Sequence, residues 1–140
     1  MKTKKDFKDD FILFLETGFI GVNQMDAQGA ANLFEACKLL EPENVLSDIG
    51  IGYLQINTLQ LKHAAVTFND VLKKDPENEM AKAFLGFAYA LTPDKVADGE
   101  KILEETSKSK DKTIKTLSDS ALDFIDKFIK KFPSPVESTD

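Results

Sequence analysis

The chain has 140 residues, and its apolar fraction of 42% and charged fraction of 30% are those of one soluble globular domain. The formal net charge is −6 and all 18 basic residues are lysines, so the chain lacks the positive field and the arginine forks that hold nucleic acid. A single cysteine and a single histidine exclude a disulfide framework and a structural zinc site, and they suit the reducing cytoplasm.

The N-terminal segment combines lysines with a short apolar run over residues 11–15, as the start of a signal peptide does. Acidic residues at positions 6, 9, 10 and 16 interrupt it, and no segment approaches the roughly 20 apolar residues that cross a bilayer. We therefore expect neither export through a signal peptide nor membrane insertion.

A repeat of 34 residues is visible around the two proline residues that follow the first two helical patterns. Six residues recur at this interval: Ala30, Ala31, Phe34, Pro42, Glu43 and Asn44 become Ala64, Ala65, Phe68, Pro76, Glu77 and Asn78. The interval is that of the tetratricopeptide repeat, whose unit is a helix, a turn and a second helix. The first hairpin therefore ends near Pro42 and the second near Pro76.

The residue types that recur at these positions fit such a hairpin. The small residue Ala30 lets two helices cross closely, and the aromatic Phe34 fills the space between hairpins. Pro42 ends the second helix because proline cannot continue the hydrogen-bond ladder, and Asn44 can cap the helix that follows. The same roles pass to the residues 34 positions later.

A third, more degenerate hairpin follows. Residues 85–89 repeat the pattern of residues 49–53 at an interval of 36, which makes Tyr89 the equivalent of Tyr53. Its turn contains Pro93, and its second helix carries Gly99 and Leu103 where the earlier hairpins have alanine and phenylalanine.

After a polar stretch at 108–112, apolar residues at helical spacing predict one more helix. Its apolar stripe consists of Ile114, Leu117, Ala121, Leu122, Phe124, Ile125, Phe128, Ile129 and Phe132. A helix with one polar side suits the covering of a solenoid's last apolar face. The expected fold is all-α: three degenerate tetratricopeptide-type hairpins in a short solenoid over residues 1–107, a linker and C-terminal capping helix over 108–132, and a disordered tail over 133–140.

Catalytic chemistry is missing from the sequence. We expect His63 to be an exposed turn residue and Cys37 to be a buried core residue. The acids at 6–10 suit a solvated helix N-terminus rather than a metal site, and no nucleophile and base are arranged together. We expect no enzyme, no cofactor and no metal.

Two glycine pairs, Gly18 with Gly21 and Gly50 with Gly52, could suggest a nucleotide-binding loop. They lack the preceding strand and the downstream spacing that such a loop requires. Close packing of helices explains them better.

The first helices of successive hairpins line a concave surface that usually binds peptide. Taking Phe19, Tyr53 and Tyr89 as equivalent, we predict the residues of a peptide-binding groove. They are Leu13, Phe14, Thr17, Ile20 and Gly21 in the first hairpin, Ser47, Ile51, Leu54 and Gln55 in the second, and Ala83, Phe84, Phe87, Ala90 and Leu91 in the third.

The predicted first helices at 45–56 and 80–91 are apolar nearly all round, although one apolar stripe would suffice for packing. Such a groove suits the apolar face of an amphipathic helix rather than a carboxylate, which lysine and asparagine would clamp. Two other ways to cover this apolar surface remain open: the chain's own C-terminal helix could fold back over it, or a second copy of the chain could bind it in a homodimer.

Residues 31–44, 49–53 and 68–78 resemble the tetratricopeptide chaperones of bacterial type III secretion, and are most similar to the branch that serves the needle subunit. The resemblance covers about residues 7–105, and the use of lysine without arginine would suit a chlamydial member. It implies a cytoplasmic chaperone that holds the amphipathic helix of the needle subunit in its groove, together with a small helical co-chaperone, and prevents premature polymerisation.

Two alternatives compete with this hypothesis. A translocator chaperone of the same system would bind an extended segment, and a protein outside it would be an adaptor or a homodimeric scaffold. We expect Ile51→Asp or Phe87→Asp to abolish partner binding while helicity is kept.

Overall fold

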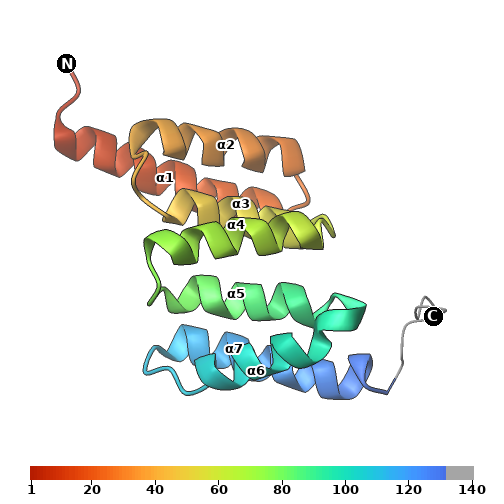
Figure 1. Cartoon of the computed structure of the whole chain (residues 1–140). Helices are drawn as coiled ribbons and strands as arrows, with labels where there is room; N and C mark the ends of the chain where they lie inside the picture. The colour runs from red at the N-terminus through yellow and green to blue at the C-terminus, as the bar shows by residue number, and fades with distance from the viewer. Residues whose placement is uncertain (132–140) are drawn as a thin grey trace. The chain divides into compact units, whose positions relative to one another are not determined.

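A computed structural model describes residues 1–131, which form helices joined by short turns and contain no strand (Figure 1). The predicted all-α fold is thereby confirmed, whereas the predicted disordered tail and Phe132 lie outside the described residues. The helices are α1 (Lys4–Asn23), α2 (Ala27–Leu40), α3 (Leu46–Asn57), α4 (Leu61–Lys74), α5 (Glu79–Ala90), the 3₁₀ turn η1 (Pro93–Lys95), α6 (Val96–Thr106), α7 (Lys112–Phe124) and the π-helical turn η2 (Ile125–Ile129).

The chain divides after Pro76 into two compact units. The first unit contains the hairpins α1–α2 and α3–α4, and the second contains the hairpin α5–α6 followed by α7. The helix that we predicted as a separate C-terminal segment therefore shares a unit with the third hairpin. Pro42 and Pro76 each lie two residues beyond the end of a second helix, as predicted.

Two aromatic rings form the centre of the first unit. Phe34 and Phe68 are fully buried, as their repeat positions predict. The Phe34 ring lies against Gly18 of α1 and Gly50 of α3, where an added Cβ would be 2.5 Å from a ring carbon. The interpretation of these glycines as close-packing positions is confirmed.

The second unit uses the same arrangement with a smaller side chain. Leu103 of α6 is fully buried and faces Gly86 of α5, while Gly99 packs directly on the backbone of Ala90. These contacts confirm that Leu103 and Gly99 replace the phenylalanine and alanine of the earlier hairpins.

The register of the third hairpin differs from our prediction. Gly18 and Gly86 face Phe34 and Leu103 in the same way, and Gly52, which faces Phe68, lies midway between them at an interval of 34. The interval for the first helix is therefore 34 rather than 36. Residues 49–53 contain two glycines, Gly50 and Gly52, so Gly86 can be aligned with either of them, and the sequence alone favoured the wrong one.

The last helix, α7, packs on both helices of the third hairpin and so covers the end of the second unit. Its residue Ala121 and the first residue of η2, Ile125, join Ala90 and Leu103 in one buried cluster. The predicted capping role is confirmed within this unit.

Side-chain capping differs between the two expected asparagines: the N-cap residue of α3 is Val45, and Asn44 before it accepts a 3.0 Å hydrogen bond from the Leu46 amide. Asn78 caps α5 by accepting a 2.9 Å hydrogen bond from the Ala81 amide, as predicted for its position. At the N-terminus Thr3 and Asp6 form a reciprocal capping box. Hydrogen bonds from Thr3 hold the pKa of the Asp6 carboxyl below its usual value.

Candidate protein-binding surface

Three of the predicted groove residues of the first hairpin lie on the exposed side of α1, whereas Gly21 faces Ala30 of α2. Leu13 and Ile20 are 58% and 53% exposed, and Thr17 is exposed between them, whereas Phe14 is half-buried. Leu13, Thr17 and Ile20 are spaced by four and three residues, so they form one stripe on the helix. We call these three residues the α1 stripe.

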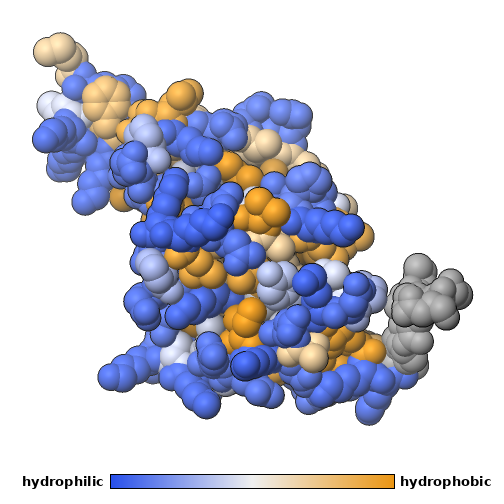
Figure 2. All heavy atoms as spheres, viewed as in Figure 1, coloured by the Kyte–Doolittle hydropathy of each residue, from blue (hydrophilic) through white to orange (hydrophobic). Residues whose placement is uncertain are grey.

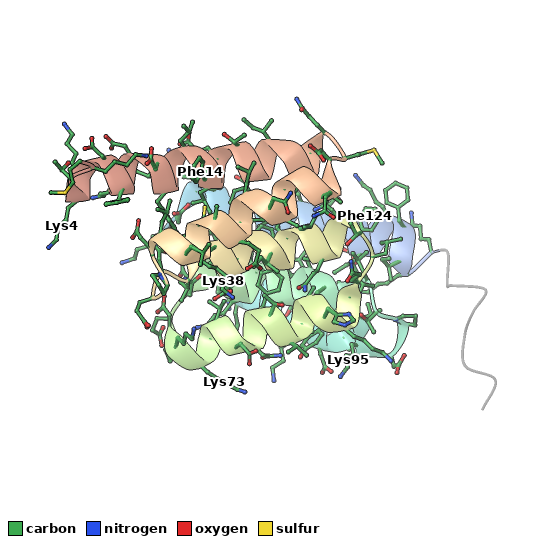
Figure 3. The ribbon with its side chains drawn as sticks, turned by 90° about the horizontal axis from the view of Figure 1, so that it is seen from above. Lys4, Phe14, Lys38, Lys73, Lys95 and Phe124 are labelled. Atoms are coloured by element: carbon green, nitrogen blue, oxygen red, sulfur yellow. The ribbon has the colours of Figure 1, made fainter. Side chains whose placement is uncertain are left out.

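The N-terminal half of α1 extends beyond α2, which is clear in both directions of view (Figures 1 and 3). Two further large apolar side chains in this half, Phe7 and Ile12, are exposed. Figure 2 shows hydrophobic surface on this projecting part among charged side chains. The helix thus presents apolar surface that α2 and α3 do not cover.

The predicted residues of the second hairpin face the layer between α2 and α4 instead. Ile51 and Leu54 pack against the Phe34 cluster, and the Gln55 side chain accepts a 2.7 Å hydrogen bond from Thr67 of α4. Ser47 is buried. Within the first unit these residues are therefore not brought together with the α1 stripe.

The predicted residues of the third hairpin lie in the second unit. Phe84, Phe87 and Leu91 are half-buried, and Ala83 and Ala90 are buried. Phe87 packs against the Leu103 cluster of its own unit. That these residues line a groove with residues of the first unit stays a prediction.

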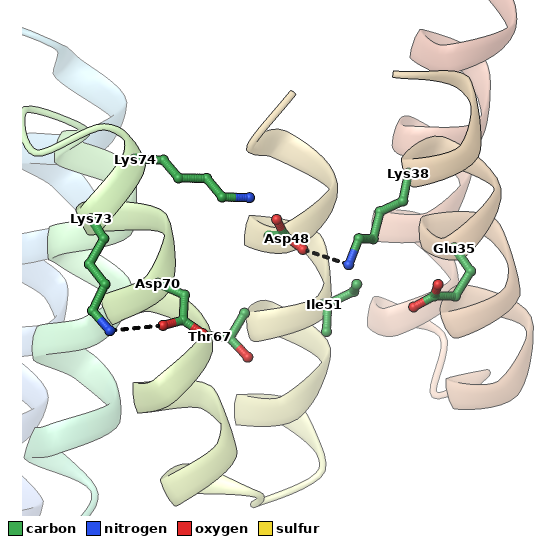
Figure 4. A pocket seen from close by; sticks show the side chains of 8 residues that line it. All are labelled: Glu35, Lys38, Asp48, Ile51, Thr67, Asp70, Lys73 and Lys74. Carbon is green, nitrogen blue, oxygen red and sulfur yellow. Dashed lines mark hydrogen bonds and ion pairs between the residues drawn. The ribbon is translucent and has the colours of Figure 1, made fainter. Parts of the chain in front are cut away.

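A cleft of about 530 Å³ opens between α2 and α4, with α3 as its floor (Figure 4). Ile51 lies at the floor, and two ion pairs flank it: Lys38 with Asp48 at 3.3 Å and Lys73 with Asp70 at 3.5 Å. Its remaining lining residues are Glu35, Thr67 and Lys74. With three lysines and three carboxylates, the cleft carries no net preference for an anion or a cation.

Sequence reasoning missed a second exposed apolar feature, at the turns of the first two hairpins. Met25 and Leu59 are 92% and 76% exposed, and both adopt a left-handed backbone with φ of 64° and 59°. They are separated by the repeat interval of 34, and this recurrence of a large apolar residue could have indicated the feature from the sequence. A smaller cleft of about 300 Å³ lies beside Met25 and is lined by Val22, Met25, Ala27, Leu54, Asn57 and Thr58.

The groups that could carry chemistry are dispersed. Cys37 is buried as predicted, its thiol lies 3.7 Å from the Phe11 carbonyl oxygen, and burial raises its pKa. His63 is exposed, but it lies in the first turn of α4 rather than in the preceding turn, because α4 begins at Leu61. Residues 1–131 contain no group of three or more His, Cys, Asp or Glu side chains that could hold a metal ion.

No protein-family model, curated protein or solved structure matches this chain. Across the part of the chain that the structure describes, none of the helices has both the length and the apolar character that crossing a membrane requires.

Proposed function

We propose that the chain is a protein-binding chaperone that covers the apolar face of an amphipathic helix, and that the α1 stripe is its primary contact. The observation that carries this proposal is the exposure of Leu13 and Ile20 on a helix whose other side packs on α2 and α3. Apolar residues at helical spacing are what a second helix uses to pack alongside.

The apolar area of the α1 stripe supports a modest affinity. Complete burial of an aliphatic side chain contributes about 1.5 to 3 kcal/mol. Leu13 and Ile20 start from roughly half exposure, so each gains only part of that amount. Phe7 and Ile12 are also exposed on the projecting half of α1, but the helical spacing places them on either side of the α1 stripe rather than in line with it. A reversible complex follows, which suits a chaperone that must release its client.

The finer proposal is a cytoplasmic chaperone of bacterial type III secretion that holds the needle subunit with a small helical co-chaperone. Its support is the sequence resemblance of residues 31–44, 49–53 and 68–78. A subunit whose apolar helix drives polymerisation must have that face covered before export, and a helix of this type would fit the α1 stripe.

The test is co-purification of the tagged full chain with a candidate needle subunit of fewer than about a hundred residues. The double variant Leu13→Gln/Ile20→Gln should lower the recovered subunit at least tenfold, because both apolar anchors are lost while glutamine preserves the helix. Leu39→Gln is the matched control, since Leu39 is 84% exposed on α2.

Equal recovery with all three proteins would place the partner elsewhere and contradict the α1 site. Recovery of a large translocator in place of a small subunit would favour the other chaperone branch. A stable dimer in light scattering that Leu13→Gln/Ile20→Gln converts to a monomer would identify the partner of α1 as a second copy of the chain.

A further inference from the structure

Met25 and Leu59 adopt a backbone conformation that is unfavourable for their side chains. They are the non-glycine residues with positive φ among residues 1–131. The left-handed region brings Cβ close to the backbone, so glycine or asparagine is normally found there. In both residues the side chain extends into solvent, so packing within the unit does not offset this cost.

The local hydrogen bonds require this backbone conformation. The Met25 amide donates to the Val22 carbonyl, and the next amide donates to the Gly21 carbonyl at 2.8 Å. The Leu59 amide and its successor make the same two bonds one repeat later. This is the glycine-favouring end of a helix, and each hairpin uses a large apolar residue in its place.

The sequence segments around both residues are almost uncharged. Segments 22–28 and 54–60 contain one charged residue, Asp26, although 30% of the chain is charged. Its side chain accepts a hydrogen bond from the Gly29 amide and so caps α2. Large exposed apolar side chains with few charged residues around them are typical of the core of a protein interface.

The spacing of the two turns suits one kind of partner. Met25 and Leu59 follow the equivalent ends of α1 and α3, and these helices pack against each other. Axes of packed helices lie about 8 to 10 Å apart. Two residues one heptad apart on a helix are separated by about 10 Å along its axis. A helix that crosses the turns can therefore reach both residues.

We infer that Met25 and Leu59 form a second docking site, which binds an uncharged stretch of the partner helix through two large apolar side chains one heptad apart. One of the two apolar side chains of the partner helix would enter the cleft beside Met25, which Val22, Ala27 and Leu54 line. This inference rests on the proposed function and deepens it. The α1 stripe and the turns would contact different segments of one partner.

The test uses the double variant Met25→Asn/Leu59→Asn in the full chain. Asparagine tolerates the left-handed backbone, so the variant removes the apolar side chains and keeps the turns. Its thermal midpoint should be no lower than that of the unchanged chain, while its binding weakens at least tenfold. A loss of binding with unchanged or increased stability is the opposite of what a merely structural role predicts.

The probe is a fluorescently labelled, uncharged helical peptide of about six turns with two leucines seven residues apart, followed by anisotropy. A second peptide has its second leucine moved to the opposite side of the helix. We expect the heptad peptide to bind the chain at least tenfold more tightly than the second peptide, and Leu39→Gln to leave both affinities unchanged.

Equal affinity of the two peptides, or no binding of the heptad peptide up to about 1 mM, would overturn the inference. Retained binding in Met25→Asn/Leu59→Asn with loss in Leu13→Gln/Ile20→Gln would overturn it while the proposed function stands. The reverse pattern would support the turn site and contradict the α1 site. A dimer that becomes monomeric in the asparagine variant would show that a second copy, not a partner helix, occupies the turns.

Discussion

The hydroxyl of Tyr53 in α3 donates a 2.7 Å hydrogen bond to the side-chain oxygen of Asn23, the last residue of α1. The same tyrosine ring lies beside Phe19, with 5.4 Å between the ring centroids. The two contacts join the first hairpin to the second. One polar and one aromatic contact at the same place therefore add to the packing of Phe34 on Gly50 between the two hairpins.

Tyr53→Phe keeps the ring and removes the hydroxyl. We expect it to lower the free energy of unfolding by about 0.5 to 1 kcal/mol, the usual contribution of such a hydrogen bond. Chemical denaturation of Tyr53→Phe, Asn23→Ala and the double variant measures this. Full additivity of the two single effects would contradict a direct interaction.

The glycines of the first unit should respond to alanine with opposite signs. Gly50→Ala places a Cβ 2.5 Å from the Phe34 ring, so the ring or the helix must shift, and about 1 to 3 kcal/mol is lost. Gly21→Ala meets its neighbours at 3.4 Å, an ordinary contact, and gains up to about 1 kcal/mol of helix propensity. Thermal unfolding of both variants measures the two effects. Equal changes in stability would show that the close contact with Phe34 does not make Gly50→Ala costly.

Relief of the left-handed backbone should stabilise the first unit. Met25→Gly and Leu59→Gly should each raise the free energy of unfolding by about 1 kcal/mol, because glycine has no Cβ to clash. The two effects should add, since the residues lie in separate turns. Destabilisation by either change would mean that the exposed side chain already packs within the unit.

A pair of hydroxyls in the second unit should show coupling. The side-chain oxygens of Thr106 and Ser118 are 2.6 Å apart and buried between α6 and α7. Thr106→Val leaves the Ser118 hydroxyl without this partner and should cost about 1 to 3 kcal/mol. Adding Ser118→Ala should recover part of the loss in denaturant titrations, and a further loss instead would exclude the coupling.

Cys37 should report on unfolding of the first unit. Burial raises the pKa of its thiol, so little reactive thiolate exists near neutral pH in the folded state. Reaction with a thiol reagent at pH 8 should be slow in buffer and become fast through the unfolding transition. Rapid modification in buffer would indicate that α2 opens locally.

The repeat interval made much of the fold predictable. Small residues, buried aromatics and prolines at 34-residue spacing have one structural explanation, so Ala30, Phe34 and Pro42 were placed correctly, and burial of Cys37 followed. Helix α7 likewise has only one apolar face, so its sequence predicts which side packs on the third hairpin.

The candidate site was less predictable, for a physical reason. Residues 45–56 are apolar nearly all round, so their pattern does not say which side of α3 faces α2 and α4. Ile51 and Phe87 proved to pack against the Phe34 and Leu103 clusters. Aspartate at either position would disturb these clusters, so the variants that the sequence suggested would report on stability as well as binding. Exposed positions such as Leu13 are the better probes.

The most direct test of the proposal is a titration of the isotopically labelled full chain with an amphipathic helical peptide that has an apolar face along its whole length, followed by backbone amide NMR signals. We expect shifts along the exposed side of α1 around Leu13 and Ile20 and at the turns that contain Met25 and Leu59. Shifts confined to the cleft between α2 and α4, or no shifts at all, would contradict it.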